Sequence, residues 1–291
     1  MRVLHIDTGL AMRGGQWQVL LLARGLRDRG VDQRILARGE LLARLQAEGF
    51  AAAEAAWAAT RATPAGLVHA HDARAHTWAA LALRRPLIVS RRVAFPVKTG
   101  LLSRLKYARA DSYLAVSRFV AGRLAAAGIP ARRVRVVYDG VEPAPPRSLR
   151  PRTLILAPRF DDPKKGSVIL NEAGLDVKFS SDLVADLAEA KMFVYLTREE
   201  GLGSAALLAQ AAGVPVVASR VGGLPEIVVH EETGLLTDNE PAAVRRAVER
   251  LLDDSELRRR LALNALRRFE ELFTVDRMVE ATLAAYQEVV R

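Results

Sequence analysis

The sequence contains no cysteine and few aromatic residues, and both absences narrow the classes of protein that it can represent. Without cysteine among its 291 residues, the chain has neither disulfide bridges nor thiolate metal sites, and it is compatible with a reducing cytosol. Aromatic residues make up 5% of the chain and hydrophobic residues 50%, a balance that favours helices rich in Ala, Leu and Val over a β-sandwich. A chain of this length is expected to form two α/β domains.

Long apolar segments are also scarce. Only a few apolar residues separate Met1-Arg2 from Asp7, so no secretory signal is expected. The longest uncharged stretch, Gly201–Ser219, is interrupted by glycines, Gln210 and Pro215, which argues against a membrane helix. We therefore expect a cytoplasmic protein, either soluble or peripheral at the inner face of the membrane.

Charge is divided unevenly between the two halves. Residues 1–150 contain 25 Lys and Arg against 10 Asp and Glu, whereas residues 151–291 contain 18 against 23. The basic half favours contact with phosphate groups or an anionic membrane surface. Because 37 of the 43 basic residues are arginine, a compositional bias of the coding sequence stays an alternative. A nucleic acid partner is not expected, since the basic residues are not interleaved with aromatic residues that stack on bases.

Strand and helix patterns alternate along both halves, which predicts parallel, doubly wound sheets. In the first half, the expected strands are Val3–Ile6, Arg34–Ala37, Leu67–Ala70, Pro86–Ser90, Ser112–Val116 and Val134–Tyr138, and the expected helices are Gln16–Arg29, Arg74–Leu83 and Arg118–Ala127, the last capped by Ser117. In the second half, strands are expected at Thr153–Ala157, Val177–Phe179, Lys191–Tyr195 and Val214–Ala218, and helices at Pro241–Leu252 and Ser255–Phe273, with Ser255 as a cap. The proline-rich segment Val141–Arg152 is interpreted as the interdomain linker.

The most informative segment is Glu199–Leu236. Gly201 and Gly203 allow the backbone to approach a ligand closely, and the expected helix Ser204–Ala212 directs its free N–H groups back at this turn. A buried strand follows, and then a second glycine turn, Gly222-Gly223, opens another helix. Two helix N-termini opened by glycine and close in sequence predict a site for an anionic ligand, best a diphosphate.

This segment resembles the nucleotide-binding domain of retaining GT-B glycosyltransferases of family 4, also called glycosyl transferases group 1. The matching residues read E-G-L-G from Glu200, G-V-P-V-V-A-S from Gly213, G-G-L-P-E from Gly222 and T-G-L-L from Thr233. The resemblance implies two Rossmann-like doubly wound domains that face each other across a cleft. The expected domains are residues 1–145 on the acceptor side, residues 146–274 for the nucleotide-sugar, and a C-terminal helix at 275–291 that crosses back to the first domain.

The resemblance also implies an activity. It is transfer of a sugar, with retention, from a nucleotide-diphosphate sugar to a cell-envelope acceptor such as a lipopolysaccharide core sugar or a lipid. No metal or other cofactor is implied. The sequence does not identify the base, the sugar, the acceptor or the oligomeric state.

Site residues follow from the same resemblance. Arg159 and Lys165 would hold the donor diphosphate, with Lys164 as an alternative, and Glu200 would lie against the donor sugar. Fixed cations suit this role because the leaving diphosphate gains negative charge. The other donor-binding residues would be Gly14, Gly15, Gly201, Leu202, Gly203, Ser204 and Leu208.

On the acceptor side, the resemblance implies His71 and the pair Arg91-Arg92. An arginine does not serve as a general base at physiological pH, but it pairs with phosphate or an anionic acceptor. The sequence HAHDARAH also contains His69, His76 and Asp72. A zinc or iron site is one interpretation of this cluster, with acceptor contacts or ordinary strand-end histidines as the alternatives, and we expect no metal.

Two departures from the family pattern support a competing hypothesis. The second glutamate of the motif, which would bind the ribose, should fall at position 208, where this chain has leucine. The interval between Arg159 and Glu199 is short, so the second domain is expected to be trimmed by a strand–helix unit. A non-catalytic binding or scaffold protein of GT-B shape is therefore the alternative function.

Overall fold

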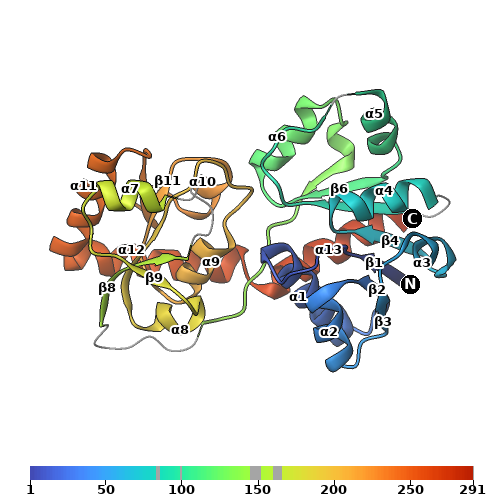
Figure 1. Cartoon of the computed structure of the whole chain (residues 1–291), viewed down its shortest axis with the longest axis horizontal. Coiled ribbons are helices and arrows are strands. Elements are labelled where there is room, and N and C mark those ends of the chain that lie inside the picture. Colours follow the sequence, from blue (N-terminus) through green and yellow to red (C-terminus); the bar gives the residue numbers. More distant parts are fainter. Residues whose placement is uncertain (83–85, 99, 145–151, 160–165, 291) are drawn as a thin grey trace. The chain divides into compact units, whose positions relative to one another are not determined.

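The chain folds into two compact units, each built around one parallel sheet (Figure 1). The computed structural model describes residues 1–82, 86–98, 100–144, 152–159 and 166–290. The first unit comprises Met1–Gly140 and Val275–Arg291, and the second comprises Val141–Thr274. The chain thus leaves the first unit five residues before the expected boundary at 145, and it returns to that unit with its last helix.

The sheet of the first unit has the order β3-β2-β1-β4-β5-β6-β7, with all neighbouring strands parallel. Its strands are β1 (Arg2–Ile6), β2 (Asp32–Ala37), β3 (Ala52–Glu54), β4 (Leu67–Ala70), β5 (Leu87–Arg91), β6 (Ser112–Ala115) and β7 (Val134–Val136). Its helices are α1 (Gly14–Asp28), α2 (Gly39–Ala47), α3 (Trp57–Ala62), α4 (Ala73–Ala82), α5 (Leu101–Ala108), α6 (Arg118–Ala126) and α13 (Val275–Val290). This strand order is that of a doubly wound sheet.

Helices α1 and α13 cover one face of this sheet. Leu22 of α1 and Met278 and Tyr286 of α13 pack together with strand residues such as Val3 and Leu114 in one buried cluster. Helix α13, red in Figure 1, lies among the blue and cyan elements of the first unit. The last helix is therefore part of the first unit's core.

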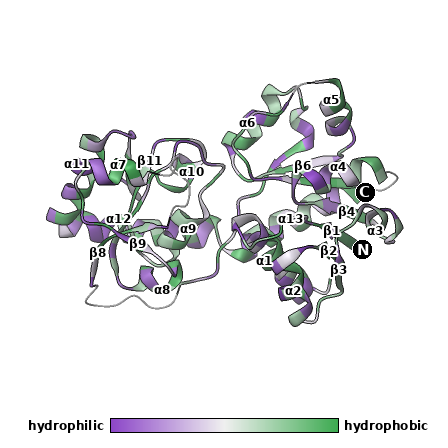
Figure 2. Ribbon diagram, viewed as in Figure 1, coloured by the Kyte–Doolittle hydropathy of each residue, from purple (hydrophilic) through white to green (hydrophobic). Residues whose placement is uncertain are grey.

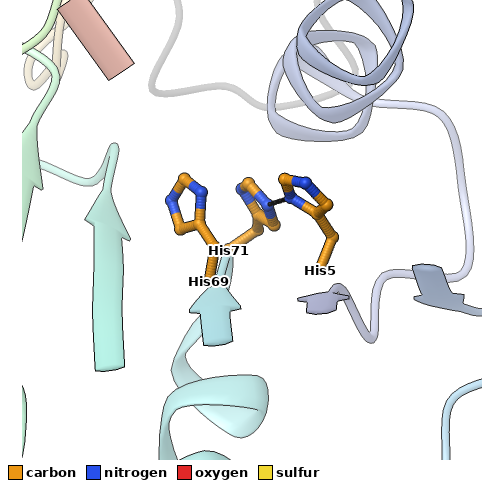
Figure 3. Close-up of side chains that lie close together, drawn as sticks. All are labelled: His5, His69 and His71. Atoms are coloured by element: carbon orange, nitrogen blue, oxygen red, sulfur yellow. Dashed lines mark hydrogen bonds between the residues drawn. The ribbon is translucent and has the colours of Figure 1, made fainter. Parts of the chain in front are cut away.

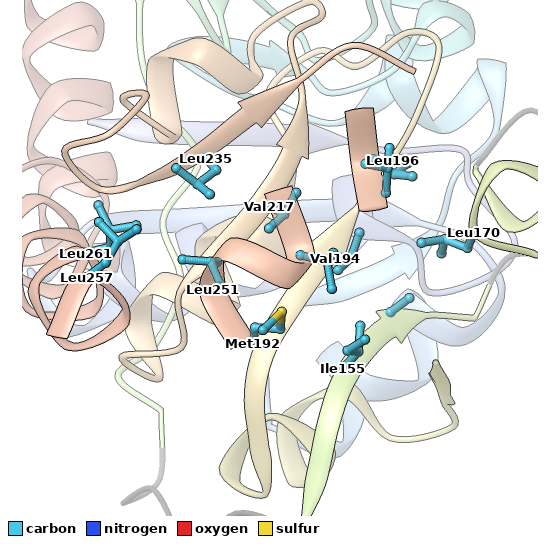
Figure 4. Close-up of a cluster of buried hydrophobic side chains, with 13 residues drawn as sticks. Ile155, Leu170, Met192, Val194, Leu196, Val217, Leu235, Leu251, Leu257 and Leu261 are labelled. Carbon is cyan, nitrogen blue, oxygen red and sulfur yellow. The ribbon is translucent and has the colours of Figure 1, made fainter. Parts of the chain in front are cut away.

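The second unit has the strand order β12-β11-β10-β8-β9, also parallel throughout. Its strands are β8 (Thr153–Pro158), β9 (Lys178–Ser180), β10 (Ala190–Tyr195), β11 (Val216–Ser219) and β12 (Gly234–Thr237). Its helices are α7 (Ser167–Glu172), α8 (Leu183–Ala188), α9 (Ser204–Ala211), α10 (Leu224–Ile227), α11 (Pro241–Asp253) and α12 (Ser255–Leu272). Figure 4 shows its apolar core, in which Met192 and Val194 of the sheet lie among leucines of α7, α11 and α12.

The alternating strands and helices predicted from the sequence are confirmed, as is the cap of α6, where the Ser117 side chain accepts from the backbone N–H of Val120 at 3.1 Å. The cap predicted for α12 is wrong: Asp254, not Ser255, precedes the helix, and its carboxylate accepts from the N–H of Leu257 at 2.8 Å. A carboxylate satisfies the free N–H groups and the positive end of a helix better than the hydroxyl one position later. The sequence analysis named no range for the short strands β3 and β12 or for the helices α2, α3, α5, α7 and α8.

Candidate functional site

The residues expected to bind the donor lie at the carboxyl ends of two neighbouring strands of the second unit. Arg159 follows β8 directly, and Glu200 lies in the loop after β10. Because β8 and β10 are parallel and paired, these two segments leave the sheet at the same edge. Parallel α/β sheets bind ligands at this edge.

The carboxylate of Glu200 is held at both oxygens. Its Oε2 accepts from the Tyr195 hydroxyl at 2.6 Å, and its Oε1 accepts from the backbone N–H of Gly201 at 3.0 Å. Burial first, and then the neighbouring carboxylate, raise the pKa of Tyr195 well above its usual value, so the phenol keeps its proton and donates. Glu200 is thereby fixed in orientation while it remains half-buried at the sheet edge.

The glycine turns that flank this carboxylate pack directly on each other. A Cβ added at Gly222 would lie 2.0 Å from the carbonyl oxygen of Glu200, and one at Gly223 would lie 2.1 Å from that of Gly201. The N–H of Gly223 also donates to the Glu200 carbonyl at 3.1 Å. The two turns predicted from the sequence therefore form one backbone platform, in which contact excludes a side chain at both Gly222 and Gly223 and the φ of 58° disfavours one at Gly222 as well.

Helix α9 begins at this platform. Its N-cap is Gly203, with φ of 115°, and no side chain caps it among the described residues. Gly201 and Leu202 are buried, whereas Ser204, Ala205 and Leu208 are the partly exposed positions of the helix. Ser204 and Leu208 are four residues apart and therefore share one helix face. Leu208 is thus not part of the core, and it lies on the side of α9 that the N-terminal Ser204 also occupies.

The segment that contains Lys164 and Lys165 lies outside the described residues. Gly166 is described, and it begins α7 with φ of 76°. A Cβ added there would lie 2.4 Å from the Cβ of Leu196, close to the end of β10. Gly166 therefore lies at the same sheet edge as Glu200.

In the first unit, Gly14 and Gly15 begin helix α1, which also lacks a side-chain cap. A Cβ at Gly15 would meet no heavy atom within 4 Å, so packing does not explain this glycine. The loop before it is tied down by buried Asp7, whose Oδ1 accepts from the N–H of Gly9 at 2.9 Å and from Gln16 at 3.0 Å. Burial is the main reason that the pKa of Asp7 is raised.

Three buried histidines lie together beside this loop (Figure 3). His5 and His69 are in register on the paired strands β1 and β4, and His71 follows β4. His5 Nδ1 lies 3.0 Å from His71 Nε2, while His69 contacts the Tyr286 hydroxyl at 2.6 Å and Ser90 Oγ at 2.8 Å. Helix α13 thus supplies a partner to the row of histidines through Tyr286.

Burial keeps these imidazoles neutral. It lowers the pKa of His5 to about 3 and the pKa values of His69 and His71 well below their usual range. One nitrogen from each lies within 4.8 Å of the others, so within the described residues this is the group whose spacing suits a metal ion. His76 and Asp72, named with His69 and His71 in the sequence, are not part of it. Asp72 instead accepts from the N–H groups of Arg74 and Ala75, at the start of α4.

Arg91 and Arg92 lie at the end of β5, and both contact protein groups. Arg92 forms an ion pair with Asp139 at 2.9 Å, with both side chains largely buried. Arg91 donates to the Tyr107 hydroxyl at 3.0 Å and to the carbonyl of Phe95. The structure adds three residues to the candidate site that the sequence did not predict, namely Asp7, His5 and Tyr195. The available signal was their position, because all three lie at or just after the carboxyl end of a strand.

Comparison with known proteins matches both halves of the chain to glycosyltransferase domains. Residues 12–145 match the family described as Glycosyltransferase Family 4, and residues 175–268 match Glycosyl transferases group 1. The structure of Anabaena Alr3699/HepE in complex with UDP-glucose superposes with a TM-score of 0.86, at 18% identity, over 99% of this chain and 100% of that one. The chain has the GT-B fold of the glycosyltransferases.

Other glycosyltransferases resemble the chain in part of the sequence or in fold. The D-inositol 3-phosphate glycosyltransferase of Corynebacterium glutamicum is 44% identical over 93 residues, which make up 32% of this chain and only 22% of that protein. The apo form of the lipopolysaccharide outer core galactosyltransferase WaaB superposes with a TM-score of 0.74, at 14% identity, over 99% of this chain and 100% of that one. No helix among the described residues is both long and apolar enough to cross a bilayer.

Proposed function

We propose that the chain transfers a sugar, with retention, from a nucleotide-diphosphate sugar to a cell-envelope acceptor, either a lipopolysaccharide core sugar or a lipid. The observation that carries this proposal is the Glu200 platform, in which an oriented carboxylate, two packed glycine turns and the open N-terminus of α9 lie together. The matched glycosyltransferase domains support it, as does the similar structure solved with UDP-glucose.

In the proposed reaction, the acceptor hydroxyl attacks the anomeric carbon on the face from which the diphosphate leaves. The bond between that carbon and the phosphate oxygen breaks, and the departing oxygen takes the hydroxyl proton. Arg159 and Lys165 stabilise the charge on the diphosphate, and the N–H groups at the start of α9 offer further donors. Glu200 orients the sugar, His71, Arg91 and Arg92 lie on the acceptor side, and no metal is required.

Arg159→Ala tests this assignment. Loss of one preorganised donor should raise the barrier by about 2–4 kcal/mol, which lowers turnover by roughly 30- to 1000-fold. Arg198→Ala is the matched control, because Arg198 is also exposed, near the same sheet edge, but carries no role in the proposal. Equal turnover of the wild type and Arg159→Ala would refute the assignment.

The competing function is a binding or scaffold protein without turnover, and Leu208 is the residue that favours it, because leucine accepts no hydrogen bond from a ribose hydroxyl. Calorimetry with UDP, GDP and ADP, free and sugar-linked, separates the two functions. Binding accompanied by release of sugar supports the enzyme, whereas no heat with any of these ligands supports the scaffold. The same titrations identify the base.

A further inference from the structure

Helix α5 of the first unit exposes an apolar face that no other described element covers. Leu101, Leu102 and Leu105 are 73%, 83% and 57% exposed, Phe95 in the preceding loop is 58% exposed, and no residue of the helix is buried. In Figure 2 the helix carries both hydrophobic and hydrophilic residues. We call Phe95 and these three leucines the α5 face. Leu105 lies four residues after Leu101 and three after Leu102, so the three leucines are neighbours on the helix surface. Exposed apolar side chains that are neighbours mark a surface that binds another apolar phase.

The charge around the α5 face has one sign. From Arg91 to Ala110 the sequence contains six Lys or Arg and no Asp or Glu. Lys98, Arg104 and Arg109 are exposed, and the Arg104 guanidinium forms no ion pair among the described residues. A positive rim around exposed leucines complements an anionic lipid surface, and it opposes contact with a second copy of the same face.

A groove lies directly beside the α5 face. It has a volume of about 560 Å³, runs between α5 and the end of α6, and is lined in part by Arg104, Tyr107, Gly128 and Arg133. Arg133 also donates to the carbonyl of Ala108 at 3.1 Å, which holds its guanidinium at the C-terminal end of α5. Two guanidinium groups at the edge of an open groove suit the phosphate of a lipid headgroup.

The helix is anchored to the sheet edge that carries the acceptor-side residues. The Tyr107 hydroxyl accepts from Arg91 at 3.0 Å, and Lys106 Nζ donates to Thr77 Oγ1 of α4 at 3.2 Å. A bilayer on the α5 face would therefore lie next to the carboxyl end of β5.

We propose that the α5 face docks the first unit on an anionic bilayer, with Leu101, Leu102, Leu105 and Phe95 inserted among the acyl chains and Arg104 and Arg133 on lipid phosphates. This binding does not depend on the transfer reaction, and it is measured without any donor. Its failure would leave the proposed transfer untouched, and failure of the transfer assay would leave the docking intact.

The absence of cysteine makes a direct test possible. Leu102→Cys is labelled with an environment-sensitive nitrobenzoxadiazole dye and mixed with vesicles of phosphatidylcholine alone or with one quarter phosphatidylglycerol. The dye should shift to shorter wavelength only with the anionic vesicles. The control is Leu263→Cys on α12 of the second unit, where the leucine is 44% exposed, and its dye should not shift.

Substitutions measured by vesicle co-sedimentation separate the apolar and charged contributions. Leu101→Ser with Leu102→Ser should lower the partition coefficient at least about tenfold, the scale for losing a buried leucine side chain. Arg104→Gln should lower it about fivefold and weaken its salt dependence, whereas Arg61→Gln, at another exposed arginine, on α3, should not. Equal binding of all variants would overturn the proposal. So would a dye shift without vesicles that grows with protein concentration, because a second copy would then cover the face.

Discussion

At the scale of single residues, Leu208 is the position where the proposed nucleotide site departs from the family pattern. It is partly exposed on α9 and shares a face with Ser204, so a carboxylate placed there meets solvent and the helix N-terminus instead of the core. Leu208→Glu should tighten nucleotide binding by about 1.5–3 kcal/mol, the range for hydrogen bonds to a charged acceptor. Isothermal calorimetry on the variant and the wild type measures this change.

The matched control is Leu263→Glu, which adds the same charge at an exposed leucine of α12 and should leave nucleotide affinity unchanged. A melting temperature is recorded for both variants. If Leu208→Glu melts lower and gains no affinity, the ribose does not lie at this position, and the scaffold function is favoured.

The buried histidines make stability dependent on pH. Burial lowers the pKa values of His5 and His76 to about 3 and those of His69 and His71 well below their usual range, whereas in the unfolded chain a histidine titrates near 6.5. Below about pH 6.5 the unfolded state therefore binds more protons than the native state. The stability that these groups provide is complete above that pH and is lost as the pH falls, by about 1.4 kcal/mol per pH unit for each histidine.

Denaturant unfolding between pH 7.5 and 4.5 should reveal this loss in the wild type. His76→Gln isolates one group, because its imidazole packs against the edges of Tyr107 and Tyr113 outside the row of three. For this variant, the slope of the unfolding free energy against pH should correspond to about one proton fewer taken up on unfolding than in the wild type. An unchanged slope would mean that His76 is protonated in the native state.

At the scale of elements, the two packed glycine turns determine the shape of the Glu200 platform. Gly222→Ala should destabilise the second unit and abolish nucleotide binding, because the new Cβ would lie 2.0 Å from the Glu200 carbonyl oxygen at a φ of 58°. Gly213→Ala shares the strained backbone, with φ of 64°, but its Cβ meets nothing within 4 Å. The Gly213→Ala variant should lose only about 1–2 kcal/mol of stability to backbone strain, and it should retain nucleotide binding. Thermal melts and calorimetry on the pair test this, and equal behaviour of the two variants would show that strain alone explains the effect.

Sequence patterns predicted strands and turns where the local signals were strong. Runs of apolar residues predicted strands β1, β4 and β10, and glycine turns predicted the Glu200 platform, because both signals depend on neighbours in the chain. The sequence predicted only part of the row of histidines. His69 and His71 are close together in the segment HAHD, whereas His5 joins them through the pairing of β1 with β4, which no local sequence signal predicts. Likewise Tyr286 reaches His69 across 217 positions. Helix α5 was missed because its leucines face outward, so the usual buried stripe is absent.

At the scale of the whole molecule, the chain returns to its first unit at the end. Met278, Val279 and Tyr286 of α13 are at most 3% exposed within that unit's core, and Val279 lies against Gly25 of α1, where an added Cβ would meet its Cγ2 at 2.5 Å. Each such side chain contributes about 1.5–3 kcal/mol by burial, so three together approach the whole stability of a typical domain, about 5–15 kcal/mol.

A chain ending at Thr274 should therefore lose the folded first unit while the second, Val141–Thr274, stays folded. Limited proteolysis should leave a protected fragment that begins near Val141, and calorimetric scans should show one transition where the full chain shows more. The triple substitution Arg277→Gln, Glu280→Gln and Glu288→Gln keeps the helix and alters only its exposed charges, so both units should persist. Protection of the first unit in the shortened chain would mean that α13 covers a core that is already stable, and that its contact with His69 through Tyr286 serves the site instead of the fold.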